Sequence, residues 1–157
     1  MKIESERLFL RSLSVQDLTS IIESEENPEL KQAYSEMLRG CADEPEKMIW
    51  HTLWFIELKT QPSTVVGSLC FKGLDADGMV ELGYGLKEGW CGKGYMTEAV
   101  KAITEWALAQ KGVTRVEAEA APENEASQKV LANAGFISTG KNGAEGLRFL
   151  YAGKIRT

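Results

Sequence analysis

The chain has 157 residues, of which 43% are hydrophobic and 26% charged, and this length and composition are typical of a single globular domain over residues 1–157. Eighteen basic and 23 acidic residues give a formal net charge of -5 at pH 7, which excludes a general attraction to nucleic acid or to an anionic membrane but allows a cationic substrate. No apolar run is long enough to cross a bilayer, and the N-terminus is predicted to be a strand rather than a signal peptide. Cys41, Cys70 and Cys91 share no metal-ligand spacing. We therefore expect a cytoplasmic protein with reduced thiols and no metal.

In chain order, the first half predicts a strand, a helical region and then three strands. A helix follows the first strand, because Ser14 and Asp17 form a capping box, and it runs to about Glu23. Residues 26–49 predict further helical and loop pieces. The predicted strands cover residues 3–11, 52–59, 65–73 and 79–86, with turns at 61–63 and 75–78 between the last three.

The second half alternates helices and strands. The long helix over about 93–110 is predicted by apolar residues at three- and four-residue spacings: Met96, Ala99, Val100, Ile103, Trp106 and Ala107. Because an antiparallel meander precedes this helix, we expect an α/β (α+β) fold with one mixed, mostly antiparallel sheet rather than a doubly wound nucleotide fold. The remaining elements are a strand at 114–120, a helix at 124–134 and strands at 136–139 and 147–151.

The most informative segment is the glycine-containing loop that leads into the long helix, Trp90-Cys91-Gly92-Lys93-Gly94-Tyr95. A helix N-terminus has N–H groups without intrahelical partners and the positive end of the helix dipole, and glycines let the main chain approach a phosphate closely. A Walker A loop is excluded because Lys93 is followed by Gly94, and a dinucleotide fingerprint lacks its third glycine at Thr97. The loop is therefore another kind of anion cradle or a glycine-rich turn without a ligand.

Three segments resemble the GNAT superfamily of acyl-CoA-dependent N-acetyltransferases. The family signature Gln/Arg-x-x-Gly-x-Gly/Ala stands here as Gly89-Trp90-Cys91-Gly92-Lys93-Gly94. Residues 124–136 resemble the family's second cofactor helix with its closing Gly-Phe, and residues 5–11 resemble the first strand of the RimJ/RimL (ribosomal-protein N-acetyltransferase) branch. The resemblance implies the GNAT fold, with six to seven strands and about four helices. It also implies transfer of an acetyl group from acetyl-CoA to a primary amine.

The resemblance further implies how acetyl-CoA is held. The pantetheine arm would pair with the main chain where two strands splay apart, at Tyr84, Gly85 and Leu86. Asn124 and Ser127, one helical turn apart, would meet it from the opposite side, although Asn124 also suits a helix N-cap. Lys93 would add charge or would be an ordinary loop lysine. The pyrophosphate would lie on the N–H groups of Cys91, Gly92, Lys93, Gly94 and Tyr95, near the hydroxyl of Thr97.

Direct attack by an amine requires an unprotonated nitrogen. Deprotonation at pH 7 costs on the order of 1 kcal/mol for an α-amine and on the order of 4 to 5 kcal/mol for a lysine. Glu81 is our candidate base, since carboxylates at its position serve this role in parts of the family, and a salt-bridged strand carboxylate is the alternative. His51 is the rival base, and Tyr84 and Tyr151 are candidate acids. An acyl-cysteine route through Cys91 is not favoured, because no histidine is near it in the sequence.

Two departures from the family pattern keep an alternative open. Gly89 stands where the signature has Gln or Arg, and Leu131 stands where many members have the Tyr that acts as acid. The alternative is a catalytically silent acyl-CoA-binding sensor, and a nucleotide-binding domain is a poorer third reading. Among relatives a homodimer is common, and the acceptor would be a protein N-terminus or a small-molecule amine.

Overall fold

The computed structural model describes residues 1–61 and 63–153, and Pro62, at the centre of one predicted turn, lies outside the described residues. The helices are α1 (Val15–Ser24), α2 (Pro28–Asp43), the 3₁₀ helix η1 (Pro45–Trp50), α3 (Tyr95–Leu108) and α4 (Glu125–Ala134). The strands are β1 (Lys2–Glu4), β2 (Leu8–Ser12), β3 (Leu53–Leu58), β4 (Val65–Leu74), β5 (Met79–Leu86), β6 (Arg115–Ala120), β7 (Phe136–Asn142) and β8 (Leu147–Tyr151).

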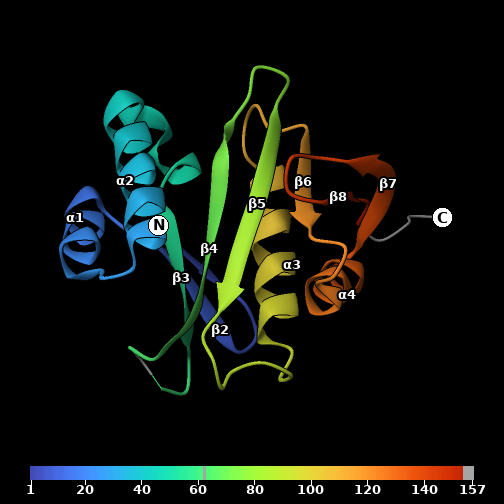
Figure 1. Cartoon of the computed structure of the whole chain (residues 1–157), viewed down its shortest axis with the longest axis horizontal. Helices are drawn as coiled ribbons and strands as arrows, with labels where there is room; N and C mark the ends of the chain where they lie inside the picture. The colour runs from blue at the N-terminus through green and yellow to red at the C-terminus, as the bar shows by residue number, and fades with distance from the viewer. Residues whose placement is uncertain (62, 154–157) are drawn as a thin grey trace.

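The strands form one eight-stranded sheet in the order β1-β2-β3-β4-β5-β6-β8-β7 (Figure 1). Neighbours are antiparallel except β5 and β6, which are parallel and connected through α3. The predicted α/β class with a single mixed, mostly antiparallel sheet is therefore confirmed. Among the described helices none is both long and apolar enough to cross a membrane.

One local prediction differs from the structure. The predicted strand over 3–11 is a short hairpin, because the chain turns at residues 5–7 and β1 pairs back on β2, with Lys2 opposite Arg11. This split raises the number of strands to eight, instead of the expected six to seven. Residues 26–49 form helical pieces as predicted: α2 begins at Pro28, where the Asn27 side chain accepts hydrogen bonds from the first N–H groups, and η1 begins at Pro45. The capping box of Ser14 and Asp17 is present as predicted.

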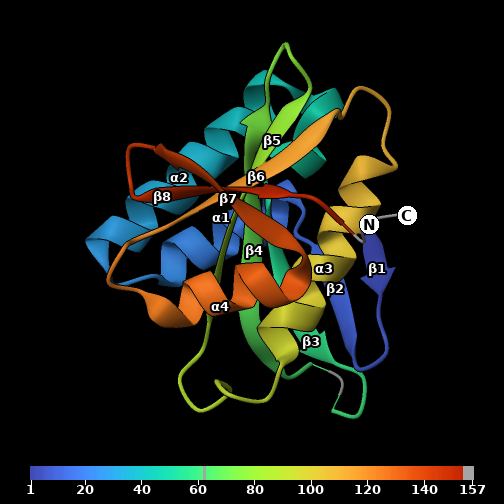
Figure 2. The same ribbon diagram turned by 90° about the vertical axis from the view of Figure 1, so that its right-hand side faces the viewer.

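Helices cover both faces of the sheet. In Figures 1 and 2, α1 and α2 lie against one face, and α3, with α4 beside it, lies against the other. The alternation within β3 shows the reason: Trp54 and Ile56 pack into the main core with α3, whereas Leu53 belongs to a smaller cluster with Leu18 of α1. The buried stripe predicted on the long helix is observed, at Met96, Ala99, Val100, Ile103 and Ala107.

The parallel pair β5 and β6 separates along its length. The two strands pair from Met79 opposite Arg115 to Leu82 opposite Ala118. Beyond this point β5 continues beside β4, up to Leu86, while β6 continues beside β8. One edge of β5 after Leu82 therefore has no partner strand in the described part of the chain, and Tyr84, on this part of β5, contacts Ser127 in the first turn of α4.

Candidate active site

The loop before α3 has the geometry of an anion cradle. Gly92 and Gly94 both have φ of 78°, a left-handed conformation that favours glycine, and Gly94 is the N-cap of α3. No side chain caps this helix. Within residues 1–61 and 63–153, the main-chain N–H groups of residues 91–97 donate to no acceptor. A row of unpaired N–H groups therefore meets the positive end of the α3 dipole.

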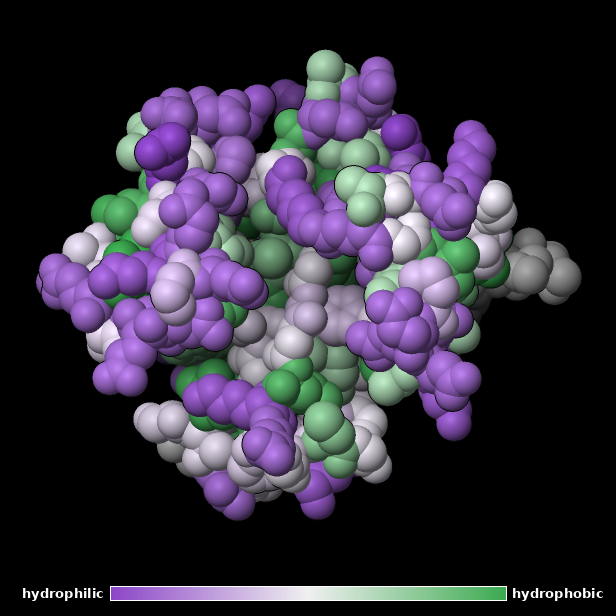
Figure 3. Space-filling model, viewed as in Figure 1, coloured by the Kyte–Doolittle hydropathy of each residue, from purple (hydrophilic) through white to green (hydrophobic). Residues whose placement is uncertain are grey.

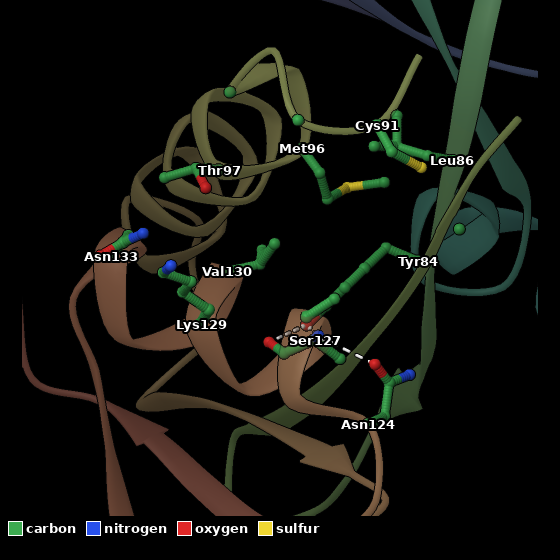
Figure 4. A pocket seen from close by; sticks show the side chains of 14 residues that line it. Tyr84, Leu86, Cys91, Met96, Thr97, Asn124, Ser127, Lys129, Val130 and Asn133 are labelled. Carbon is green, nitrogen blue, oxygen red and sulfur yellow. Dashed lines mark hydrogen bonds between the residues drawn. The ribbon is translucent and has the colours of Figure 1, made fainter. Parts of the chain in front are cut away.

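A cavity of about 550 Å³ joins this loop to the unpaired edge of β5 (Figure 4). The surface of the molecule is hollowed along β4 and β5, between more hydrophilic flanks (Figure 3). Of the residues proposed to hold the cofactor, the structure brings together along this cavity Tyr84, Gly85, Leu86, Cys91, Gly92, Gly94, Thr97, Asn124 and Ser127. Lys93 and Tyr95 belong to the same loop but do not line the cavity.

Tyr84 links β5 to α4 across the gap (Figure 4). Its hydroxyl lies 2.8 Å from Ser127 Oγ and donates to the Ser127 carbonyl at 3.2 Å. Burial raises the pKa of Tyr84, and the hydrogen bond with Ser127 only partly opposes this. Asn124 is the N-cap of α4, and its side-chain oxygen accepts from the Ser127 N–H at 3.0 Å. The capping role foreseen for Asn124 therefore coexists with its position on the cavity wall.

Glu81 lies in a network of charges on the opposite side of β5. Its carboxylate is 2.8 Å from Lys72 Nζ and 2.8 Å from Arg148 Nη1. Burial acts to raise the pKa of Glu81, but the hydrogen bonds from Lys72 and Arg148 outweigh it, so the pKa is lowered. The salt-bridged state foreseen as an alternative is therefore present.

The cavity of about 550 Å³ has a smaller neighbour of about 210 Å³, which Glu81 lines. Tyr84, Asn124 and Ser127 line both cavities and form the boundary between them. The smaller cavity is mostly polar, with Lys72, Glu119 and Glu145 among its other lining residues.

The rival catalytic candidates have different surroundings. His51 Nε2 lies 2.8 Å from Glu44 Oε1, and His51 shares a third cavity, of about 240 Å³, with Glu81. Tyr151 packs edge-on against Phe136 and its hydroxyl is 3.4 Å from Glu105, so it lines none of these cavities. Leu131 is completely buried in the core.

Several lining residues were not predicted. Ala126, Val130 and Asn133 recur at helical spacing along the face of α4 that carries Ser127, and this periodicity could have identified them. Met96 and Lys129 complete the lining. By contrast, Arg148 contacts Glu81 across 67 positions of sequence, and no local pattern indicates such a pair.

Comparison with known proteins identifies the family of this chain. Residues 7–137 match the family described as acetyltransferase (GNAT) domain. The chain is 35% identical to the uncharacterized N-acetyltransferase YjdG of Bacillus subtilis (strain 168) over 102 residues, which are 64% of this chain and 60% of that protein, so it spans less than two thirds of this relative.

Solved structures with low sequence identity have the same fold. An acetyltransferase from Agrobacterium tumefaciens is 21% identical, with a TM-score of 0.73 and coverage of 98% of this chain and 95% of the other. RimL, the ribosomal L7/L12 α-N-protein acetyltransferase in complex with coenzyme A, is 17% identical, with a TM-score of 0.72 and 96% coverage of both chains. Because the family match covers most of its length, the chain belongs to the acetyltransferase (GNAT) domain family.

Proposed function

We propose that residues 1–157 form a single N-acetyltransferase domain that transfers an acetyl group from acetyl-CoA to a primary amine. The observation that carries this proposal is the cavity of about 550 Å³, in which an unpaired strand edge continues into a cradle of unpaired N–H groups. An extended arm with amide groups suits the first feature and a diphosphate suits the second. Coenzyme A contains both, and RimL, which shares this fold, is described in complex with it.

The residues present fit acetyl-CoA. The main chain of Tyr84, Gly85 and Leu86 would pair with the pantetheine arm, and a Cβ at Gly85 would meet no atom within 4 Å, so this side of the strand is open. The N–H groups of residues 91–95 would receive the diphosphate, with Lys93 adding positive charge from the rim. Asn124 and Ser127 would contact the arm from α4. When bound, acetyl-CoA supplies the thioester carbonyl that an amine attacks.

We assign removal of the amine proton to Glu81, in the smaller cavity, and protonation of the leaving sulfur to Tyr84, on the boundary between the two cavities. Glu81, ionised at neutral pH, would accept the amine proton through a water. Tyr84 would donate a proton to the leaving sulfur, because its raised pKa keeps it protonated, and solvent would reprotonate it through Ser127 Oγ, which lies 2.8 Å away. Leu131 cannot supply this proton, so Tyr84 would replace the tyrosine that many family members have there.

The charge state of Glu81 bears on the acceptor. Its lowered pKa makes it a weak base, which is adequate for an α-amine, whose deprotonation at pH 7 costs on the order of 1 kcal/mol, but poor for a lysine side chain, at on the order of 4 to 5 kcal/mol. We therefore favour an acceptor amine of low pKa, such as a protein N-terminus or an amino-acid-like small molecule. RimL, which shares this fold, is an α-N-protein acetyltransferase, and this agrees with the preference for an α-amine.

Thiol release from acetyl-CoA tests the function, with polyamines, amino acids, aminoglycosides and peptides bearing free N-termini as acceptors, alongside calorimetric titration of CoA. Release with one acceptor class supports the proposal. CoA binding without release from any amine supports the silent sensor instead, and absence of CoA binding refutes the cofactor assignment.

The Glu81→Gln variant tests the proposed base. We expect turnover at pH 7 to fall on the order of 100-fold, and the deficit to shrink as pH rises, because more of the amine is then already deprotonated. Glu23→Gln, at an exposed position of α1, is the matched control and should leave turnover unchanged. An equal deficit at every pH would remove Glu81 as the base, and His51→Gln would then be the next variant to compare.

A further inference from the structure

The turn between β1 and β2 contacts the cofactor loop, although about 86 residues separate the two segments in sequence. We propose that Arg7, in this turn, is a positioning residue that holds the loop of residues 92–95 in the conformation that binds the diphosphate of coenzyme A. This inference rests on the proposed function and concerns a residue of the segment 5–11, to which the family resemblance assigns no role in binding the cofactor.

The guanidinium of Arg7 makes contacts on several sides. Its Nε donates to Glu98 Oε1 at 2.6 Å, and its Nη1 donates to the Lys93 carbonyl at 3.0 Å. Its plane lies over the ring of Tyr95, with Cζ 4.5 Å from the ring centroid. Arg7 Nη2 would lie 3.3 Å from a Cβ at Gly94, so the guanidinium also packs against the N-cap residue. One side chain thereby contacts the loop, the N-cap and the first turn of α3.

Glu98 anchors this arrangement from the helix. Its carboxylate accepts from Ser5 Oγ at 2.6 Å and from the Arg7 N–H at 2.8 Å, in addition to Arg7 Nε. Burial acts to raise the pKa of Glu98, but these hydrogen bonds outweigh it and lower the pKa, so Glu98 is ionised at neutral pH. A carboxylate in the first turn of α3 would repel a nearby diphosphate unless a cation offsets its charge, and Arg7 is paired with it.

The loop needs such a support from elsewhere in the chain. Gly94 has no side chain with which to cap α3, and Gly89 supplies no side chain at the position where the family signature has Gln or Arg. Two left-handed glycines within three residues also leave the loop many conformations in solution. Arg7 restricts these conformations by fixing the Lys93 carbonyl, and so it lowers the entropy cost of ordering the loop on a bound anion.

Calorimetric titration of CoA into the full chain tests the role of Arg7. We expect Arg7→Ala to raise the Kd for CoA about tenfold, the loss expected for one charge-assisted hydrogen bond. Arg7→Lys retains the charge, but its ammonium group lacks the planar guanidinium that donates to Glu98 and to the Lys93 carbonyl at the same time. It should therefore recover only part of the affinity, with a Kd about threefold above wild type. Arg39→Ala, at an exposed position of α2, removes the same charge and should leave the Kd unchanged.

Thermal unfolding without CoA separates positioning from general stability. A purely structural role would lower the Tm of Arg7→Ala without changing the Kd of the folded protein, and that result would overturn the inference. A Kd for Arg7→Ala within about twofold of the Arg39→Ala control would also overturn it. If Arg7→Ala does not fold, Arg7→Lys carries the same comparison. Failure of the wild-type protein to bind CoA would instead refute the proposed function, which keeps the two failures distinct.

Discussion

Replacing Arg148 by Met should destabilise the protein strongly, because this guanidinium holds three carboxylates on adjacent strands. It donates to Glu81 at 2.8 Å, to Glu117 at 2.7 Å and to Glu119 at 2.7 Å. The Arg148 side chain is only 18% exposed and the three carboxylate side chains between 6% and 16%. Burial of Arg148 acts to lower its pKa, but the hydrogen bonds with the three carboxylates outweigh this and raise the pKa. Met fills a similar volume but leaves the three negative charges close together.

The size of the effect follows from this burial. Removing one partner of a buried ion pair costs about 3 to 5 kcal/mol, because the remaining charge stays desolvated and unpaired. For a chain of this length, 1 kcal/mol shifts Tm by about 2 to 4 °C, so Arg148→Met should lower Tm by about 6 to 20 °C. Arg115→Met is the matched control: Arg115 is 42% exposed and, among the described residues, forms an ion pair with Glu117 alone, and an exposed pair contributes at most about 1 kcal/mol.

The pH dependence gives a second signature of the same network. The pKa values of Glu81 and Glu117 are lowered in the folded protein because hydrogen bonds from basic side chains outweigh burial. Their contribution to stability is therefore complete above the unfolded carboxyl pKa of about 4.3 and is lost as pH falls through the lower folded values. The difference in unfolding free energy between wild type and Arg148→Met should be largest at pH 7 and should shrink below about pH 4.

Urea denaturation followed by circular dichroism, at pH 7, 5 and 3, measures the loss in unfolding free energy and its dependence on pH. A loss for Arg148→Met no larger than that for Arg115→Met would refute the argument that burial makes this network strong. A loss of the expected size that does not change with pH would show that packing of the Arg148 stem, rather than its charge, carries the stability.

Two further substitutions test the cavity. Gly85→Val adds a side chain whose Cβ meets no protein atom within 4 Å, so the Tm without ligand should stay within about 3 °C of wild type. The Kd of this variant for CoA should rise at least about tenfold, whereas the control Lys141→Val, on the exposed strand β7, should not change it. Unchanged CoA affinity in Gly85→Val would refute the placement of the pantetheine arm. Tyr84→Phe should lower turnover on the order of 100-fold with little change in CoA affinity; turnover equal to wild type would transfer the acid role to Ser127, for which Ser127→Ala is the test.

The parts of the fold that the sequence predicts well are those with a strong local pattern. The buried stripe of the long helix, the capping box at Ser14 and the alternation of Val80 and Leu82 on β5 are all set by neighbours within a few residues. The first strand was predicted as one piece because its residues suit a strand throughout, whereas the structure inserts a turn at residues 5–7 that contacts Glu98 of α3. Local pattern alone carries no information on such a distant contact.

The candidate site divides in the same way. Gly92, Gly94 and Asn124 are recognisable because a loop or a cap requires those residue types in the sequence itself. Arg148 and Arg7 are not, because an arginine on a strand or in a turn is usually a solvated surface residue. Their roles depend on carboxylates 67 and 91 positions away, which only the folded sheet brings close.

The separation of β5 from β6 gives one structural cause to both halves of the proposed reaction. If β6 had continued to pair with β5 beyond Leu82, the main chain of Tyr84 would have no free edge for the cofactor. The same separation lets Tyr84 reach Ser127 on α4, so that these two residues form a wall shared by the larger cavity and the polar one. A donor in the first cavity and an amine in the second would therefore meet at this wall, with Glu81 on the amine side. Closing the gap by mutation should thus remove cofactor binding and acetyl transfer together, whereas changes at Glu81 should affect transfer alone.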